Sequence, residues 1–344
     1  MRFLLYPFSF IYYIITTVRN ILYDYQIFKS KKHKIPIICV GNLSMGGTGK
    51  TPHTDYITKL LEKKYNLAII SRGYGRRSSG FKYVKLNSDP LDIGDEPLML
   101  KNKNPNTIVA VNNNRNQAVE KIINDHPEIN LIILDDGYQH RKIQASIYIL
   151  ITPFHNLFYN NNILPFGTLR ESKKESKRAD IILISNSPNK ISDKIKNNII
   201  KSINPKKHQS IYFSSVKYLN YKSLKDNSEL KKEDYKDYSV TLVSGIASNT
   251  KLLEYVKKQH DNIKILSFSD HYNYNEQDIH KILSHHMKHK NRKKLILTTE
   301  KDATKLKQFL SLIGNNKIYY LDIEINIYKN EKFNKNLTNY VREN

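Results

Sequence analysis

The amino-acid sequence predicts an α/β protein, in which a parallel sheet carries helices on both faces and a smaller C-terminal α/β unit follows. Short runs rich in branched aliphatic residues recur at 67–70, 107–111, 131–136, 146–152 and 180–185. Such runs are typical of strands that are buried on both faces. Segments with helix-spaced apolar residues, among them 53–64 and 115–124, lie between these runs. This alternation favours parallel strands joined by helices.

A second series of alternating elements begins near residue 238. Strand-like pieces at 238–246, 263–272 and 294–302 alternate with helices expected at 250–258 and 276–288. The preceding stretch is rich in Lys, Asn and Ser and contains one strand-like piece, SIYFSSVKYL. The expected organisation is therefore an N-terminal helix (1–30), a first α/β domain (31–190), a linker (191–236) and a C-terminal α/β domain (237–344).

The composition restricts the class of protein. A chain of 344 residues can bury a large core, and a single cysteine, Cys39, excludes a disulfide framework. Because Cys39 lies in an apolar strand pattern, we expect a buried, reduced thiol. The net charge of +24 at pH 7 is typical of proteins with a polyanionic partner, such as nucleic acid, an anionic membrane or a phosphorylated substrate. The chain is also crowded with Lys, Asn, Ile and Tyr, so a solvated basic surface is an equal alternative.

Residues 1–28 are nearly all apolar or aromatic. The uninterrupted apolar part, from Phe3 to Val18, is shorter than the roughly 20 residues that a bilayer crossing requires. No small-residue cleavage site follows, which argues against a signal peptide. An aromatic-rich amphipathic helix remains, and it either lies in a membrane interface or packs as an ordinary core helix.

The segment VGNLSMGGTGKT at 40–51 directly follows the apolar run IPIICV. Glycines between a strand and a helix allow backbone N–H groups to surround an anion at the helix N-terminus. The expected phosphate loop consists of Ser44, Met45, Gly46, Gly47, Thr48 and Gly49, with Ser44 in place of the first glycine of the general pattern. Lys50 is expected to reach the β and γ phosphates and Thr51 to hold Mg²⁺. The first domain is therefore expected to be P-loop NTPase-like and to bind a nucleotide.

Two further motifs contain carboxylates. Asp135 and Asp136 follow the buried run LIIL, at the sheet edge where metal and phosphate ligands collect, although turn aspartates are the alternative. Asp95 lies in GDEP, which by itself predicts a turn, and His271 lies in DHYNY. A carboxylate and a histidine together make a good base for a sugar hydroxyl, but the sequence alone does not bring these two residues together.

In this order, the motifs resemble one family, the lipid A 4′-kinases or tetraacyldisaccharide 4′-kinases. The resemblance covers about residues 35–306 and rests on VGNLSMGGTGKTP, SRGYGRR, GDEPLML, LDDGYQHRKI, PFGTLRE with RAD, FSDHYNY and TTEKDATKL. The family's phosphate loop also lacks the first glycine, so Ser44 agrees with membership.

The resemblance implies transfer of the γ-phosphoryl group of ATP to the 4′-hydroxyl of an acylated glucosamine disaccharide 1-phosphate, giving lipid IVA. It implies a peripheral or monotopic monomer at the cytoplasmic face of the bacterial inner membrane, with the N-terminal helix on anionic lipid. No nucleic acid partner is implied.

The resemblance also implies roles for single residues. Lys50 and Thr51 bind the phosphates and Mg²⁺, and Asp135 and Asp136 complete the metal site. Asp95 is the expected base, with His271 as its partner across a cleft between the domains. Arg170 is expected to neutralise charge on the transferred group, with an Arg170–Glu171 pair as the alternative. Residues around the disaccharide and its 1-phosphate are expected to be Arg72, Tyr74, Arg115, Gln139 and His140, unless these are turn residues and surface charges.

Two other functions use the same loop. One is a membrane-associated switch or partitioning ATPase, which needs no second substrate. A GTPase is disfavoured because the guanine-reading motif N-K-x-D is absent: in TEKD, Lys lies next to Asp. A nucleic-acid motor is suggested by the charge, but no second motor core is recognisable. Consumption of ATP with and without the lipid disaccharide separates these functions.

Overall fold

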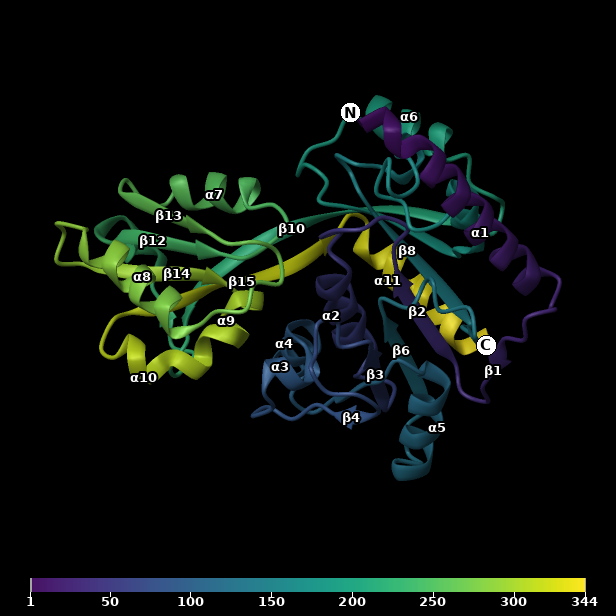
Figure 1. The fold of residues 1–344 in the computed structure, drawn as a ribbon, viewed down its shortest axis with the longest axis horizontal. Coiled ribbons are helices and arrows are strands. Elements are labelled where there is room, and N and C mark those ends of the chain that lie inside the picture. The colour runs from purple at the N-terminus through teal and green to yellow at the C-terminus, as the bar shows by residue number, and fades with distance from the viewer. Residues whose placement is uncertain (1, 344) are drawn as a thin grey trace.

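The computed structural model describes residues 2–343, and within them one continuous sheet of 13 strands links two lobes (Figure 1). The outermost residues of the two predicted terminal units, 1 and 344, lie outside the described part. The strand order is β13-β12-β14-β15-β10-β9-β8-β2-β6-β3-β5-β4, and β11 pairs with β10 off this path. The N-terminal lobe carries the strands from β9 to β4. The C-terminal lobe comprises residues 224–317, between the two long strands β10 and β15.

The six main strands of the N-terminal lobe are parallel, as the sequence predicts. They are β2 (Ile37–Gly41), β3 (Leu67–Ser71), β5 (Ile108–Val111), β6 (Leu131–Asp135), β8 (Ile147–Pro153) and β9 (Ile181–Ser185). Nearly every residue in them is buried, which explains why their sequences are continuously apolar. The short β4 (Lys82–Tyr83) is antiparallel at the edge, and β1 (Lys31–Lys32) with β7 (Ile143–Gln144) forms a separate pair.

Helices cover both faces of this part of the sheet. One face packs against α2 (Lys50–Leu61), α4 (Asp95–Lys103) and α11 (Asn330–Glu343), and the other packs against α5 (Arg115–Asp125). The short α3 (Pro90–Ile93) precedes α4. The sequence assigns residues 330–343 to the C-terminal unit, but Phe333, Leu337 and Val341 of α11 are buried in the core of the N-terminal lobe. Cys39 is buried and free, as predicted.

The C-terminal lobe contains a second set of parallel strands with helices on both faces. Its strands are β12 (Ser239–Ser244), β13 (Ile263–Ser267) and β14 (Lys294–Thr299). One face packs against α8 (Glu276–Met287), α9 (Glu300–Leu306) and α10 (Leu310–Ile313), and the other against α7 (Thr250–Lys257). Short 3₁₀ turns lie at Arg2–Leu5, Phe158–Asn160, Lys173–Arg178, Lys232–Asp237 and Lys307–Phe309.

Two long strands connect the lobes, where the sequence suggests a linker over 191–236. That segment is not an irregular linker: it contains α6 (Asp193–Ile203), β11 (Glu229–Leu230) and one of the two connecting strands, β10 (Ser210–Ser223). Residues 210–213 of β10 pair with β9, and residues from 214 onward pair antiparallel with β15 (Ile318–Ile327). Ser214 and Ser215 are buried, and the hydroxyl of Ser214 is hydrogen-bonded to His53. The strand-like piece SIYFSSVKYL predicted from the sequence thus lies in β10, and the buried hydroxyl of Ser214 is satisfied by a partner from α2.

The N-terminal helix α1 (Tyr6–Asp24) lies along the surface of the N-terminal lobe (Figure 1). Its polar residues face inward, since Ser9, Thr16 and Asn20 are buried. Its apolar residues face outward, and Phe8 and Ile15 are 63% and 60% exposed. This orientation excludes the alternative of an ordinary core helix. In residues 2–343, no helix combines the length and apolar character needed to cross a membrane.

Candidate active site

The phosphate loop connects β2 to α2 at the carboxyl edge of the sheet. Gly46 and Gly49 have φ angles of +96° and +86°, which favour glycine. The amide of Asn42 donates to Thr48 Oγ1 at 2.7 Å, and the hydroxyl of Ser185 donates to the carbonyl of Thr48 at 2.7 Å. The loop shape is thus held from β2 and from the end of β9, and its backbone N–H groups lie at the start of a helix, where anions bind.

His53 fixes the first turn of α2. Its Nδ1 lies 2.7 Å from the carbonyl of Gly49, and its Nε2 lies 2.8 Å from Ser214 Oγ on β10. Burial lowers the pKa of His53 to about 4, so the ring is neutral at pH 7. A neutral ring donates from Nδ1 to Gly49 and accepts the Ser214 hydroxyl at Nε2. His53 therefore links the strand that connects the lobes to the phosphate loop.

Asp135 ends β6 in a completely buried position beside the phosphate loop. Its Oδ1 accepts a hydrogen bond from Thr54 at 2.8 Å, whereas its Oδ2 is buried without a hydrogen-bond partner among the described residues. Burial and the charge of Glu96 raise the pKa of Asp135 to about 7. A buried, unpartnered carboxylate oxygen is costly. An oxygen of this kind suits a hard cation such as Mg²⁺, which prefers oxygen ligands.

Asp136 turns its carboxylate toward two cations. Its φ of +52° is unusual for a residue with a side chain. Oδ2 lies 3.8 Å from Lys50 Nζ, and Oδ1 accepts a hydrogen bond from Arg170 at 3.0 Å. Burial disfavours the carboxylate, but Lys50 and Arg170 outweigh it and lower the pKa of Asp136. The lysine and the arginine are thus held at the phosphate loop by one carboxylate.

Backbone pairing places Arg170 next to the phosphate loop. Its N–H donates to the carbonyl of Leu43 at 2.7 Å, and its guanidinium also donates to the amide oxygen of Asn42. Glu171 does not pair with Arg170 in the structure; it pairs with Arg178 at 2.7 Å and with Arg19 of α1 at 3.4 Å. The alternative of an Arg170–Glu171 pair is therefore wrong.

Asp95 and His271 lie in contact, although 176 positions separate them. Asp95 begins α4, His271 lies in the loop after β13, and Asp95 Oδ2 is 3.2 Å from His271 Nδ1. Lys305 Nζ lies 2.9 Å from the same oxygen. Burial opposes ionisation, but His271, Lys301 and Lys305 outweigh it and hold the pKa of Asp95 well below its usual range. Asp95 is therefore an ionised carboxylate in a nearly buried position.

The residues expected around the substrate have different surroundings. Arg72 and Tyr74 are exposed, and the Tyr74 ring lies 5.1 Å from the His271 ring. Arg115 is buried and donates to the carbonyl of Asn112 at 2.7 Å. Burial and the charge of Arg115 lower the pKa of His140 to about 4.

Gln139 and His140 differ in their hydrogen bonds. The amide of Gln139 donates to the carbonyl of Asn42 at 2.8 Å, directly after the strand that leads into the phosphate loop. His140 Nε2 is buried without a hydrogen-bond partner among the described residues. A buried nitrogen of this kind is available to a ligand.

Four residues of the site were given no role from the sequence. They are Asn42 and His53 at the phosphate loop, and Lys301 and Lys305 beside Asp95. All four lie in the motifs VGNLSMGGTGKTP and TTEKDATKL or next to them. The motifs identify the segments, but the roles depend on contacts with distant segments.

The parallel sheet and the glycine loop between β2 and α2 define the class of protein, a nucleotide-binding protein of the P-loop type. A model of the tetraacyldisaccharide-1-P 4′-kinase family matches residues 1–342. The chain therefore belongs to the tetraacyldisaccharide-1-P 4′-kinase family.

Individual relatives agree with this membership. Tetraacyldisaccharide 4′-kinase of Bacteroides thetaiotaomicron is 41% identical, covering 99% of this chain and 93% of the relative. The enzyme of the same name from Flavobacterium psychrophilum is 39% identical, covering 99% and 97%. A crystal structure of LpxK from Aquifex aeolicus in complex with ATP is similar with a TM-score of 0.78 and 28% identity, covering 99% of both chains.

The predicted family, fold class and activity are thereby confirmed. The chain is an ATP-dependent kinase that acts on the 4′ position of a tetraacyldisaccharide 1-phosphate, a lipid A precursor.

Proposed function

We propose that Asp95 is the general base of the 4′-kinase reaction and that His271 is its partner. In this reaction, a bond forms between the 4′-oxygen of the sugar and the γ-phosphorus of ATP. The bond from that phosphorus to the bridging oxygen breaks, ADP leaves, and the hydroxyl proton passes to Asp95. The observation that carries this proposal is the 3.2 Å contact between His271 Nδ1 and the nearly buried carboxylate of Asp95.

The phosphate side of the site has separate roles. The loop from Ser44 to Gly49 surrounds the phosphates with N–H groups, and Lys50 contacts the β and γ phosphates. Thr51, Asp135 and Asp136 would hold Mg²⁺, which neutralises phosphate charge when bound. Arg170 compensates charge that develops on the transferred group. The support is the pairing of Lys50 and Arg170 with Asp136, and the unpartnered oxygen of Asp135.

We assign binding of the disaccharide, the phosphoryl acceptor, to basic and polar residues near Asp136. Arg72, Arg115 and His140 interact electrostatically with one another, which suits the 1-phosphate of the disaccharide. Gln139 and Tyr74 would contact the sugar rings. Tyr74 lies beside His271, so its ring would also border the reacting hydroxyl.

We further propose that α1 lies in the interface of an anionic membrane at the cytoplasmic face of the inner membrane. Its outward face exposes large apolar side chains, and the chain carries a net charge of +24. The protein acts there as a peripheral or monotopic monomer. The two lobes would act as domains that close around the substrates by bending at β10 and β15.

Turnover by Asp95→Asn and His271→Asn tests the base. Asparagine suits the positive φ of +57° at position 271, so the second variant keeps the backbone. The assay measures ATP consumption in detergent with and without the lipid disaccharide. Asp95→Asn should lower kcat about 10²-fold or more, and His271→Asn should lower it less.

A surface carboxylate on the neighbouring helix provides the control. Asp92→Asn removes an exposed carboxylate three positions from Asp95 and should leave turnover unchanged. Near-normal turnover by Asp95→Asn would refute the base assignment. Consumption of ATP that does not depend on the disaccharide would favour a switch ATPase instead.

The membrane proposal is tested with Ile11→Glu on α1 and Ile195→Glu on α6. Both side chains are exposed, 55% and 45%, so neither change disturbs a core. Full burial of an isoleucine contributes about 1.5 to 3 kcal/mol, so Ile11→Glu should weaken binding to phosphatidylglycerol vesicles about tenfold or more. Ile195→Glu should bind like the wild type. Equal binding by all three proteins would refute the proposal.

A further inference from the structure

Lys301 lies close to the proposed base, to its histidine partner and to two further carboxylates. It lies on α9, and its Nζ is 3.0 Å from His271 Nε2 and 2.9 Å from Asp270 Oδ1. The same Nζ lies 3.9 Å from Asp95 Oδ2 and 3.7 Å from Glu96 Oε1. Its side chain is only 14% exposed. Lys301 therefore contacts Nε2 of His271, whereas Asp95 contacts Nδ1 of the same ring.

The contact with Nε2 restricts the protonation of His271. A lysine ammonium group has three donors and no acceptor. Burial opposes the charge of Lys301, but Asp95, Glu96 and Asp270 outweigh it and raise its pKa. At 3.0 Å, a charged Lys301 donates to Nε2, so that nitrogen must carry a lone pair. The proton of a neutral ring then lies on Nδ1, 3.2 Å from Asp95 Oδ2.

We propose that Lys301 is a positioning residue, which keeps His271 neutral with its proton on Nδ1 and so directs that N–H to Asp95. This inference rests on the proposed function, in which Asp95 is the base. It assigns different tasks to the two components of the pair. Asp95 receives the proton of the sugar hydroxyl, and His271 orients the carboxylate through one hydrogen bond.

Lys305 has a different task, although it lies one helical turn further along α9. Its side chain is 5% exposed, and its Nζ lies 2.9 Å from Asp95 Oδ2 and donates to the carbonyl of Tyr272 at 3.0 Å. Within residues 2–343, the hydrogen bond from a lysine to the His271 ring comes from Lys301 and not from Lys305. Lys305 therefore neutralises the buried carboxylate, whereas Lys301 acts on the histidine.

The charged groups around His271 determine how its protonation changes when Lys301 is removed. Asp95 and Glu96 face the pair from α4, Lys301 and Lys305 face it from α9, and Asp270 adjoins it in the same loop. The ring of Tyr74 is a further neighbour, with its centroid 5.1 Å from that of the His271 ring. Without Lys301, Nε2 is free to take a proton beside two carboxylates. An imidazolium paired with Asp95 makes that carboxylate a weaker base.

The test uses Lys301→Met, Lys301→Arg and the control Lys307→Met, whose lysine is exposed on the turn that follows α9. Lys301→Met should lower kcat about tenfold at pH 7 with little change in KM for ATP, since only part of the base function is lost. The acid limb of its pH profile, where kcat/KM falls as the pH is lowered, should lie at higher pH than in the wild type. Lys301→Arg restores a charged donor and should return the acid limb toward the wild-type position. Lys307→Met should match the wild type.

Nitrogen-15 NMR of histidine-labelled protein gives a second readout that needs no turnover. Comparison with His271→Asn identifies the signals of His271. In the wild type, Nδ1 should show the shift of a protonated nitrogen and Nε2 that of an unprotonated one. A wild-type Nε2 that carries the proton would overturn the inference, and so would a Lys301→Met enzyme with the wild-type pH profile. The NMR result and Lys301→Arg decide the matter even if Lys301→Met does not fold.

The two proposals fail in distinguishable ways. If Asp95→Asn keeps near-normal turnover, the base assignment fails together with the role of Lys301. If Asp95→Asn loses turnover but Lys301→Met keeps the wild-type kcat and acid limb, the base assignment stands and only the role of Lys301 is refuted.

Discussion

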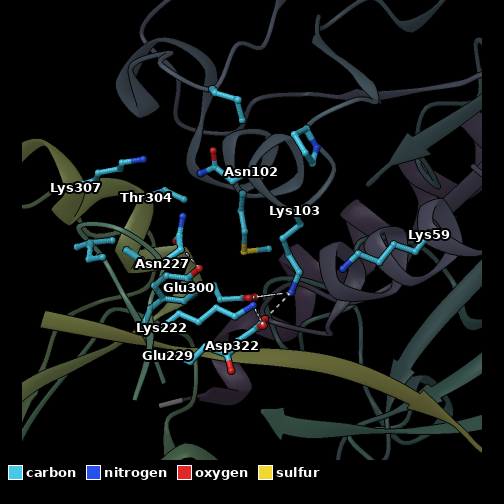
Figure 2. A pocket seen from close by; sticks show the side chains of 16 residues that line it. Lys59, Asn102, Lys103, Lys222, Asn227, Glu229, Glu300, Thr304, Lys307 and Asp322 are labelled. Atoms are coloured by element: carbon cyan, nitrogen blue, oxygen red, sulfur yellow. Dashed lines mark hydrogen bonds and ion pairs between the residues drawn. The ribbon is translucent and has the colours of Figure 1, made fainter. Parts of the chain in front are cut away.

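Replacing Glu300 with glutamine should make the stability of the protein less dependent on pH. Glu300 lies at the start of α9 and is 9% exposed, and both its oxygens accept hydrogen bonds from Lys103 of α4, at 2.9 and 3.1 Å. Lys103 also lies 3.3 Å from Asp322 and 3.6 Å from Asp55. Figure 2 shows Lys103 pointing between Glu300 and Asp322 in a cavity of about 650 Å³. Three carboxylates thus share this lysine where the two lobes meet.

The size of this pH effect on stability can be calculated from the pKa of Glu300 in the folded protein and its ordinary value. Burial, followed by a hydrogen bond with Asp322, raises the pKa of Glu300 to about 8 from its ordinary 4.5. Because the folded-state pKa is the higher one, the folded protein binds this proton more tightly between these two pH values. The stabilisation is present at low pH and is lost as the pH rises toward 8. At about 1.4 kcal/mol per pH unit, the loss between pH 6 and pH 8 is about 2 to 3 kcal/mol.

Glutamine keeps the shape and a donor for Asp322 but does not titrate. The free energy of unfolding should be measured by urea denaturation, followed by circular dichroism because the chain has no Trp, from pH 5.5 to 9. Glu300→Gln should gain stability relative to the wild type as the pH rises. The control Glu229→Gln changes an exposed carboxylate of the same cavity and should behave like the wild type. A difference between wild type and Glu300→Gln that is equal at pH 6 and pH 8 would refute the shared proton.

Three further predictions concern the core of the N-terminal lobe. Glu171→Ala should lower the free energy of unfolding by about 1 to 3 kcal/mol in urea denaturation, because Arg178 loses this partner and keeps only Glu175 as an ion-pair partner; a loss below 1 kcal/mol would contradict this. Gly41→Ala should lower the free energy of unfolding by about 1 to 3 kcal/mol, because the added Cβ would lie 2.6 Å from Tyr138 Cβ. Unchanged stability in heat and urea denaturation would refute that close approach. His53→Gln should reduce the loss of stability on acidification from pH 6.5 to about 4, because the pKa of His53 is depressed to about 4 and its stabilisation disappears as the pH falls through that range. Parallel acid denaturation curves of this variant and the wild type would show that His53 is not the group responsible.

Sequence patterns identified the elements whose surroundings are uniform along their length. The strand at 67–71 is continuously apolar because both its faces are buried, so its sequence alone predicts it. The strand β10 has buried serines, and the partner of Ser214 is His53, 161 positions away. The sequence therefore predicts a strand-like piece at this position, but not that the strand pairs with both lobes and joins them. Helix α4 was not predicted, because Gly94 and Pro97 around Asp95 are also typical of a turn.

In the candidate site, too, some features follow from the local sequence, and others depend on contacts between distant segments. The phosphate loop is a contiguous segment, so its glycines, Lys50 and Thr51 were predicted from spacing. The approach of Asp95 to His271 depends on how two lobes meet, and no local pattern encodes it; it was expected only from the family resemblance. Lys301 lies within the motif TTEKDATKL but had no predicted role, because its task becomes visible only from its distance to His271 Nε2.

Helix α1 shows why periodicity alone left two alternatives open. A core helix and an interfacial helix both have an apolar stripe, and only the contacts of the polar stripe distinguish them. Ser9 accepts a hydrogen bond from the N–H of Phe166 at 2.8 Å, and the hydroxyl of Tyr12 donates to the carbonyl of Arg170 at 3.1 Å. Arg19 donates to the carbonyl of Gln139 at 2.8 Å. The inward side of α1 is therefore hydrogen-bonded to the backbone of two residues of the candidate site, Arg170 and Gln139. If α1 lies in the membrane interface as proposed, these hydrogen bonds hold the site at a fixed distance from the membrane surface, so that a disaccharide can reach the site while its acyl chains remain in lipid.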